Sequence, residues 1–383
     1  MEFDFDGEIN RTDFSSVKWN RYRGRDVIPM WIADADFRVD EHILTAIRQQ
    51  LDHGVLGYTN PNEYKPGSDA VVAWLKAEYG WSIEPQWIVW MPGVVPAFNV
   101  ACRAFCQPGD KVLVQTPNYP PLLRAPDLHG LQMAEVPTRL RRGRWVLDLD
   151  LLEQKAADPR CTLFLLCNPM NPCGSVFSRE ELETVAGICR RHGVYICSDE
   201  IHCDLILQQG LTHTPTASLP ELAGSALTIM SAAKSFNIAG LGAAFSIVPD
   251  VQLRHRYVRA AQGLVPSVNV LGLVATAAAF QYGRAWLRAQ IDYLRANRDL
   301  LEQGINSIDG LSVTTPVATF LAWIDASALG VGDVQSLFES WGVGPSPGRD
   351  FGQPQFARIN FACPRRLIER ALERISAGVS ARV

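Results

Sequence analysis

The sequence lacks the features that would mark a membrane, metal-binding or nucleic-acid-binding protein. Its apolar runs all fall well short of the roughly 20 residues that a membrane-spanning helix needs. The nine cysteines and seven histidines contain no CxxC pair and no regular zinc-ligand spacing. A net charge of −4 leaves no basic surface for nucleic acid or an anionic membrane. We therefore expect no bound metal, no membrane anchor and no nucleic-acid partner.

The cysteines and the first residues bear on the compartment. Nine is an odd number, and the spacing does not resemble the disulfide framework of a secreted protein. The opening stretch, MEFDFDGEINR, is acidic and has no apolar core of the kind that a signal peptide carries. These observations favour reduced thiols and a cytoplasmic protein.

What is present in the middle of the chain is an alternation of short apolar runs with amphipathic stretches. This alternation is typical of βα units and predicts an α/β fold with a mainly parallel sheet. Five apolar runs are the candidate strands: WIVWM (87–91), KVLVQ (111–115), CTLFLLC (161–167), VYIC (194–197) and ALTIM (226–230).

Beyond about residue 285 the pattern changes. Residues 285–308 have the periodicity of a long helix, and two strand-like runs follow at 318–326 and 356–362 before a last helix over 365–379. We expect a large domain over residues 46–285 and a smaller α+β domain over 286–383, with residues 1–45 packing against the small domain.

Each of the five apolar runs ends in an unusual polar or glycine-containing cluster. In open α/β sheets, ligands bind outside the carboxyl ends of the strands. Five such clusters on five successive strand ends predict a single functional site at one edge of the sheet.

Lys234 is the most informative residue in these clusters, because it lies in a run of small and apolar residues, LTIMSAAKSFNIAG (227–240). An ammonium in apolar surroundings loses hydration, so its pKa falls and a reactive amine becomes available. Such an amine can form a Schiff base with a carbonyl compound. The alternative is a surface lysine between a strand and a helix.

Several motifs follow one another in an order that carries a family resemblance: MWIADADF (30–37), GYTNP (57–61), GVVPAFN (93–99), TPNYPP (116–121), NPMNPCG (168–174), SDEIHCDL (198–205) and AAKSFNIAG (232–240). With ARINFACP (357–364) near the end, the whole chain resembles the fold-type I pyridoxal-phosphate enzymes, and within them the MalY/PatB-type cystathionine β-lyases. The expected sheet is then of the seven-stranded type.

The resemblance implies pyridoxal 5′-phosphate as the cofactor and assigns residues around its ring. Lys234 would carry the cofactor and then act as the acid and base at the substrate Cα, while Asp199 would pair with the pyridinium nitrogen. Asn171 would donate to the 3′-oxygen, and Tyr119 would stack on the ring as a further catalytic residue. His202 would also contact the cofactor, at a position where many aminotransferases have a tyrosine.

The cofactor phosphate needs donors, and a helix start can supply them. Gly93, Val94 and Val95 precede a helix-like run and offer backbone N–H groups. Ser231, three residues before the lysine, would add a hydroxyl. Tyr58 resembles the tyrosine that reaches the phosphate from the neighbouring subunit in this superfamily, which implies a homodimer with shared sites.

On the substrate side, Arg358 would bind the α-carboxylate of an amino acid through its planar fork. Ala33 would line the same side, and Tyr58 would contribute there as well. Simpler interpretations exist for several of these residues. The simpler interpretation of Asp199 is a helix N-cap, that of Asn171 is a turn residue, and that of Tyr58 and Tyr119 is a packing aromatic.

The resemblance implies a C–S β-lyase that splits cystathionine or another cysteine S-conjugate into thiol, pyruvate and ammonia. Aminotransfer of an amino acid is the alternative, because it uses the same residues. Gly242 favours the lyase branch, since aminotransferases often place a phosphate-binding arginine at that position, and His202 favours it too. A further alternative is a protein that binds a transcription regulator and retains residual lyase activity.

Overall fold

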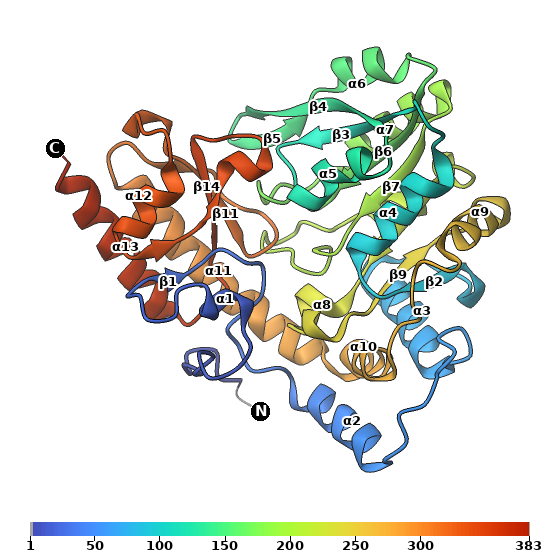
Figure 1. The fold of residues 1–383 in the computed structure, drawn as a ribbon, viewed down its shortest axis with the longest axis horizontal. Helices are drawn as coiled ribbons and strands as arrows, with labels where there is room; N and C mark the ends of the chain where they lie inside the picture. Colours follow the sequence, from blue (N-terminus) through green and yellow to red (C-terminus); the bar gives the residue numbers. More distant parts are fainter. Residues whose placement is uncertain (1–2, 383) are drawn as a thin grey trace.

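A sheet of eight strands forms the centre of the large part of the molecule (Figure 1). The computed structural model describes residues 3–382. Across the sheet the strands are β2 (Ile88–Met91), β9 (Ala244–Ile247), β8 (Ala226–Met230), β7 (Tyr195–Asp199), β6 (Cys161–Cys167), β3 (Lys111–Thr116), β4 (Gln132–Arg141) and β5 (Arg144–Leu147).

All strands except β9 and β5 point the same way. β8, β7, β6, β3 and β4 pair in parallel, and β2 has their direction because both β2 and β8 are antiparallel to β9. The prediction of a mainly parallel sheet is therefore confirmed. All five predicted strands are present, and their carboxyl ends lie along one edge of the sheet.

The sequence prediction missed three strands. β4 is mostly exposed and polar, so it has no continuous apolar run, and β9 has only four residues. β5 adds an antiparallel eighth strand to the expected seven-stranded type, because the chain turns back after β4 at Arg142 and Gly143, both with positive φ. A strand that is buried on both faces has a continuous apolar run, which can be detected in the sequence. A hairpin at the edge of the sheet is not buried in this way and has no such run.

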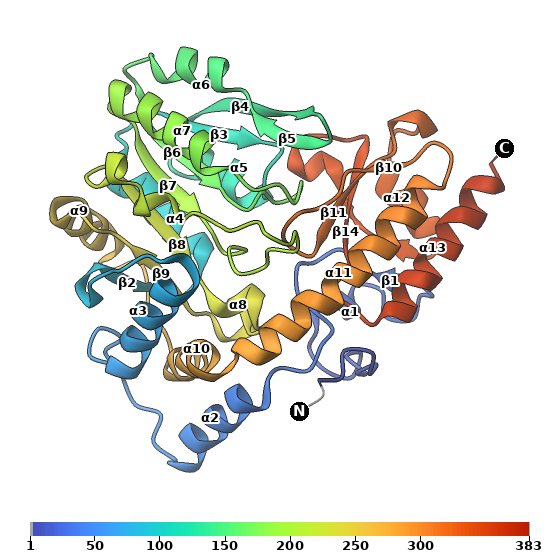
Figure 2. The ribbon, with the colours of Figure 1, turned by 180° about the vertical axis from the view of Figure 1, so that it is seen from behind.

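Helices cover both faces of the sheet (Figures 1 and 2). Successive residues of β6 alternate between the two resulting layers, since Leu163 and Leu165 pack on one side and Phe164 and Leu166 on the other. One layer holds α4 (Val94–Phe105), α5 (Pro120–Leu128) and α9 (Val251–Ala261); the other holds α3 (Lys65–Tyr79), α6 (Leu149–Ala156), α7 (Arg179–His192) and α10 (Val270–Tyr282).

The bounds of these helices follow from local sequence signals. Ser178 caps α7 by accepting from the N–H of Glu181, whose side chain accepts from the Ser178 N–H in return. Gly193 ends the same helix at φ 68°, a left-handed conformation that glycine adopts without strain. The chain then enters β7, so the helix end fixes where that strand begins.

A second, smaller sheet is antiparallel and has the order β10 (Ser312–Val313), β11 (Leu321–Asp325), β14 (Phe356–Asn360) and β13 (Ser346–Pro347). The long helix α11 (Arg284–Asn306) runs to it from the large sheet's layers, and α12 (Val334–Ser340) and α13 (Arg365–Ser380) lie beside it (Figure 2). The predicted long helix, both strand-like runs and the last helix are confirmed.

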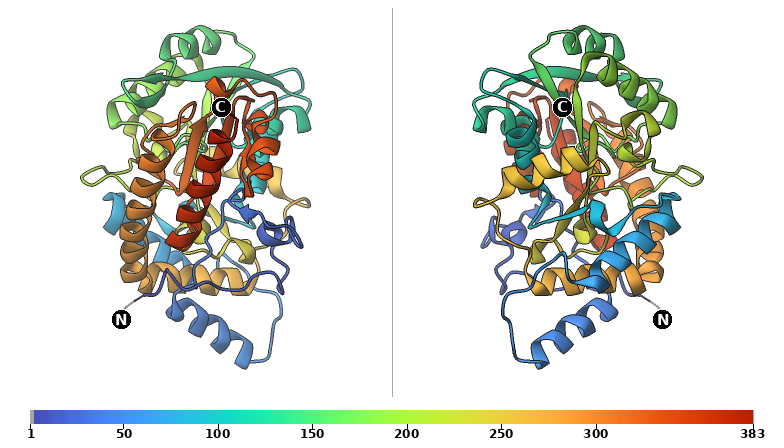
Figure 3. Two further views of the ribbon diagram at one scale, coloured as in Figure 1. Left: turned by 90° about the vertical axis from the view of Figure 1, so that its left-hand side faces the viewer. Right: turned by 90° about the vertical axis from the view of Figure 1, so that its right-hand side faces the viewer.

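The N-terminal region contacts both parts. β1 (Ile28–Pro29) pairs in parallel with β12 (Val343–Gly344), next to the short helix α1 (Val17–Asn20). α2 (Glu41–Asp52) packs on α10 and projects from the body, as the side views in Figure 3 show. The domain boundaries near residues 45 and 285 stay a prediction. Between residues 3 and 382, none of the helices is long and apolar enough to cross a membrane.

A buried glutamine extends the pairing of β3 with β6 at the edge where the site lies. Backbone pairing between these strands ends at Val114 and Leu165. Beyond that point the Gln115 side chain accepts from the Cys167 N–H (2.9 Å) and donates to the Cys167 carbonyl (3.2 Å). The amide thus takes the place of a strand partner just before the NPMNPCG turn.

Replacing Gln115 with alanine should destabilise the fold, because both Cys167 backbone groups would be left buried without a partner. We expect the free energy of unfolding to fall by about 3 kcal/mol, measured by urea unfolding at a fixed cofactor concentration. The control Gln132→Ala, at an exposed position of β4, should change it by less than about 0.5 kcal/mol. Equal effects of the two substitutions would contradict a role for Gln115 in strand pairing.

Candidate active site

The common direction of the strands brings the predicted residues to one edge of the large sheet. Tyr119 follows β3, Asn171 follows β6, Asp199 ends β7 and Lys234 follows β8. Arg358 comes from β14 of the small sheet and reaches the same place, because its guanidinium Nη1 donates to the Asn171 side-chain oxygen at 2.9 Å. One site therefore lies between the two sheets.

Lys234 lies on the short helix α8 (Ala232–Ser235), and its Nζ donates to the carbonyl oxygen of Ala33 at 2.5 Å. Burial lowers the pKa of Lys234 to about 8, while the nearby Asp34 carboxylate acts in the opposite direction. A substantial fraction of free amine is thus available at a mildly alkaline pH. This environment argues against the alternative of a surface lysine.

Asp199 is buried at the end of β7. Burial raises the pKa of its carboxyl to about 7, although the Ile201 N–H donates to Oδ1 at 3.1 Å and favours the charged form. The alternative of a helix N-cap is not confirmed. The side chain accepts a backbone bond as an N-cap does, but the bond closes a turn and no helix follows. A cation placed against this carboxylate would stabilise its charged form.

The neighbouring Glu200 belongs to a polar cluster that sequence reasoning missed. Its carboxylate is fully buried and is 2.6 Å from Nε2 of the equally buried His213. It also accepts from the hydroxyl of Ser198 and the N–H of Thr216, each at 2.8 Å. No spacing rule links residue 200 with residues 213 and 216, since the loop that joins them has no periodic pattern.

Arg358 is buried, and burial lowers the pKa of its guanidinium to about 10. Besides Asn171, it donates through Nη2 to the Trp31 carbonyl (2.7 Å) and to the Ser346 hydroxyl (3.1 Å), and it lies over the Phe351 ring. Its Nε has no hydrogen-bond partner among residues 3–382. A carboxylate could satisfy that remaining donor.

Two aromatic rings, those of Tyr119 and His202, complete the site. Tyr119 is the N-cap residue of α5, and burial and the Asp199 carboxylate both raise the pKa of its hydroxyl. His202 is buried with its ring edge against Phe320, and burial together with the positive Lys234 lowers its pKa well below the ordinary value. His202 is therefore neutral, and its Nδ1 has no partner within the described part of the chain.

The predicted phosphate donors differ in their state. Gly93 is the N-cap residue of α4, so the N–H groups of Val94 and Val95 form the first turn of a helix of twelve residues. The Ser231 hydroxyl, in contrast, donates to the Ala243 carbonyl at 2.6 Å and accepts from the Ala233 N–H. It must turn away from Ala243 before it can donate to a phosphate.

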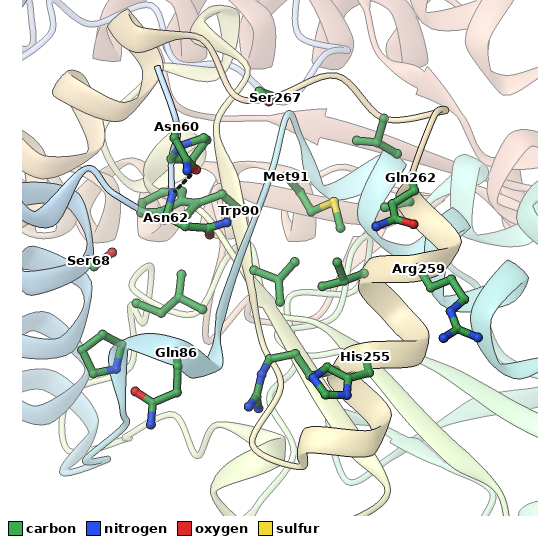
Figure 4. A pocket seen from close by; sticks show the side chains of 18 of the residues that line it. Asn60, Asn62, Ser68, Gln86, Trp90, Met91, His255, Arg259, Gln262 and Ser267 are labelled. Carbon is green, nitrogen blue, oxygen red and sulfur yellow. Dashed lines mark hydrogen bonds between the residues drawn. The ribbon is translucent and has the colours of Figure 1, made fainter. Parts of the chain in front are cut away.

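Tyr58 does not reach the site of its own chain. It lies in the connection between α2 and α3 and is fully exposed, as are the neighbouring Val55 and Leu56 in large part. A groove of about 1110 Å³ begins at Asn60 and passes β2 to reach α9 and Gln262 (Figure 4). This groove does not contain Lys234.

Comparison with known proteins identifies the family. The model for the aminotransferase class I and II family matches residues 25–375. The chain belongs to this family. It is 37% identical to the cystathionine β-lyase PatB of Bacillus subtilis, over 98% of this chain and all of that protein.

Solved structures agree with this assignment. The crystal structure of OvoB has 46% sequence identity and a TM-score of 0.96, covering 99% of this chain and 100% of the other. A C–S lyase from Staphylococcus hominis, solved with pyridoxal 5′-phosphate bound, has 31% identity and a TM-score of 0.92, covering 99% and 98%. The chain is thus a pyridoxal-phosphate-dependent enzyme of fold type I, and the predicted family, fold and cofactor are confirmed.

The residues at the site fit this cofactor. A lysine with a lowered pKa suits the aldehyde, and a buried carboxylate suits a positive ring nitrogen. The buried Nδ1 of His202, which lacks a partner among residues 3–382, fits a polar atom of a bound group. The start of α4 offers N–H groups to a phosphate.

The lowered pKa of Lys234 predicts how the apo protein captures its cofactor. Only the deprotonated amine attacks the aldehyde, so the rate of capture should rise between pH 6.5 and 9 with a midpoint near 8. Stopped-flow absorbance after mixing with pyridoxal 5′-phosphate measures this rate. The control Lys111→Ala should leave the profile unchanged. Lys111 is paired with Asp158 and is the first residue of β3, at the end of the strand opposite to the site. A midpoint above about 9.5 would mean an ordinary, solvated lysine.

Proposed function

We propose that the protein is a C–S β-lyase that converts cystathionine or another cysteine S-conjugate into a thiol, pyruvate and ammonia. The observation that carries this proposal is the group formed by the partly buried Lys234 and the buried Asp199 and Arg358, in a chain similar over its whole length to PatB, a cystathionine β-lyase. An amine, a carboxylate and a guanidinium are the groups that such an elimination requires.

The bound cofactor supplies an electron-accepting ring that stabilises negative charge at the substrate Cα. Asp199 would hold the ring nitrogen in its positive form, because a buried carboxylate is stabilised by a cation beside it. Asn171 would donate to the 3′-oxygen, and its own oxygen accepts from Arg358. Tyr119 would stack on the ring, and the neutral His202 would donate to a polar atom of the cofactor.

The start of α4 would hold the phosphate. The N–H groups of Val94 and Val95 belong to the first turn of that helix, after the N-cap residue Gly93. Ser231 would join them if its hydroxyl left the Ala243 carbonyl. No arginine helps at residue 242, because Gly242 has φ 57° and an added Cβ would lie 3.2 Å from the Pro92 carbonyl oxygen.

Arg358 binds the substrate α-carboxylate through its guanidinium, including the Nε, and so fixes the amino acid beside Ala33. Lys234, once free, removes the Cα proton, for which an amine of pKa near 8 is well suited. The bond from Cβ to sulfur then breaks and the sulfur leaves as a thiolate. The remaining three-carbon unit is hydrolysed to pyruvate and ammonia.

Aminotransfer would need the proton to return to the cofactor instead of the loss of a leaving group. Gly242 and His202 support the lyase branch, since both depart from the residues common in aminotransferases. The backbone at residue 242 also disfavours a larger residue. The same reasoning leaves a purely regulator-binding role without a supporting observation in the structure.

We expect the purified protein to release pyruvate and thiol in equal amounts from L-cystathionine. The Lys234→Ala variant should bind pyridoxal 5′-phosphate without a covalent link and lose activity by at least about 1000-fold, because it lacks the base at Cα. Pyruvate, thiol and the absorbance of the cofactor are followed together.

Two results would contradict the proposal. Conversion of the cofactor to its pyridoxamine form without thiol release would indicate an aminotransferase. Retained turnover in Lys234→Ala would show that another group is the base. The Lys155→Ala variant serves as the matched control and should keep full activity. Lys155 lies in the last turn of α6, far from the edge of the sheet that carries the site.

We further propose that the protein is a cytoplasmic homodimer with shared sites. All nine cysteines are unpaired and buried, which is the state expected of a reducing compartment. The exposed apolar residues Val55, Leu56 and Leu264 flank Tyr58 and the groove of Figure 4, and a second copy would bury them. Tyr58 would then reach the phosphate and the substrate of the other subunit.

Shared sites predict complementation between two damaged chains. Tyr58→Ala and Lys234→Ala homodimers should each be strongly impaired, whereas a mixed dimer should contain one site with both native residues. Co-expression of the two variants should restore about a quarter of the wild-type activity per subunit. Activity that never exceeds the sum of the separate variants, or a monomer by analytical ultracentrifugation, would refute shared sites.

A further inference from the structure

A short irregular segment, residues 31–36, passes over the site and is called the strap here. Both of its ends are tied to the small sheet by backbone bonds. The Asn360 N–H donates to the Met30 carbonyl (2.8 Å), and the Asp36 N–H donates to the Ala362 carbonyl (2.9 Å). Between these two points the strap leaves β14, so its own carbonyl groups need other donors.

Asn360 supplies two of those donors. Its Nδ2 donates to the carbonyls of Ile32 and Asp34, both at 2.7 Å, and its Oδ1 accepts from the Ala362 N–H. Asn360 is fully buried and lies two residues after Arg358 on β14, so both side chains point to the same face of the strand. The strand that carries the guanidinium thus also carries the strap.

Asn237 holds the other end from the side of Lys234. Its Oδ1 accepts from the Ala35 N–H (3.1 Å), and its Nδ2 donates to the carbonyls of Ala35 (3.0 Å) and Phe37 (2.9 Å). Asn237 lies three residues after the lysine and has φ 56°. Asparagine and glycine tolerate this left-handed conformation better than other residues do.

Two further carbonyls of the strap accept from groups that the reaction needs. Lys234 donates to the Ala33 carbonyl, and Arg358 donates to the Trp31 carbonyl, which also accepts from the Ser346 hydroxyl. Once Lys234 is bound to the cofactor, its nitrogen is no longer an ammonium that can donate a hydrogen bond to the Ala33 carbonyl. The strap then loses its central bond at the moment when the site becomes functional.

We propose that Asn237 and Asn360 are positioning residues that hold the strap over the site after Lys234 has passed from the Ala33 carbonyl to the cofactor. This proposal rests on the proposed role of Lys234. The two asparagines keep Ala33 beside the substrate carboxylate, while neither touches the reacting atoms. Their contribution is greater in the loaded enzyme than in the apo protein, because only the apo protein keeps the bond from Lys234.

The Asn237→Gly variant tests this arrangement, since glycine accepts φ 56° and removes only the side chain. Hydrogen exchange is followed by mass spectrometry in peptides that cover residues 31–37, with and without pyridoxal 5′-phosphate. We expect exchange in the loaded variant to be about tenfold faster than in the loaded wild type, because two hydrogen bonds to Ala35 of the strap and one to the adjoining Phe37 are lost. The difference should be clearly smaller in the apo proteins.

Steady-state kinetics provides the second readout. The KM for L-cystathionine should rise roughly fivefold to tenfold in Asn237→Gly while kcat changes about twofold at most, because the loss lies in substrate positioning. Asn237→Asp keeps the acceptor for the Ala35 N–H but places a carboxylate oxygen against the carbonyls of Ala35 and Phe37, so its KM should rise at least as much as that of the glycine variant.

Asn306→Ala is the matched control. Asn306 makes the same kind of paired contact with the Val313 N–H and carbonyl at the far end of α11. It should leave exchange in residues 31–37 and the KM unchanged. Equal exchange in wild type and Asn237→Gly, with the absorbance band of lysine-bound cofactor present in both, would overturn the strap proposal alone. Absence of that band in the wild type would overturn the role of Lys234 and the strap proposal with it.

Discussion

The placement of three ionisable groups at one largely buried site is the constraint on which the rest of the structure depends. Burial brings the pKa of Lys234 down to about 8 and that of Asp199 up to about 7, and it lowers the pKa of Arg358 to about 10. Two basic groups, Lys234 and Arg358, thus lie close to Asp199 at one site. Basic groups of this kind favour the binding of two anions, a phosphate and a carboxylate.

The need to bring ionisable groups to a largely buried site also explains why amide side chains are frequent near it. Where the chain bends to bring a charged group inward, its backbone loses strand partners, and a buried N–H or carbonyl without a partner is costly. Gln115 replaces a strand partner for Cys167, and Asn297 donates to the carbonyls of Phe361 and Cys363 just after β14. Neutral amides supply these hydrogen bonds without adding charge. The charge at the site is therefore set by the groups that act on the substrate.

The sequence could reveal those parts of the fold that a local pattern dictates. Strands buried on both sides have continuous apolar runs, as β6 does, and their polar ends pointed to one site. Lys234 was visible because a charge in an apolar stretch is unusual, and Arg358 because it interrupts an apolar strand. The motifs in their order added the cofactor, which no single pattern could supply.

The remainder of the site depends on tertiary contacts that leave no local trace. Glu200 and His213 are thirteen residues apart and meet only because the loop after β7 returns to the sheet. Asn237 and Ala35 are separated by about half the chain, so no spacing could predict their bonds. Ser231 shows the converse, since its position was suggestive but its hydroxyl is already engaged with Ala243.

The state of the phosphate donors links cofactor binding to assembly. With glycine at residue 242 and the Ser231 hydroxyl held by a carbonyl, one chain offers the phosphate chiefly the N-terminus of α4. A second chain that supplied Tyr58 would add the missing hydroxyl donor. Linkage is reciprocal, so a contact that strengthens cofactor binding in the dimer must strengthen the dimer by the same free energy when the cofactor is bound. The exposed connection after α2 would then serve the phosphate of the partner subunit, whereas α2 itself is held by its packing on α10.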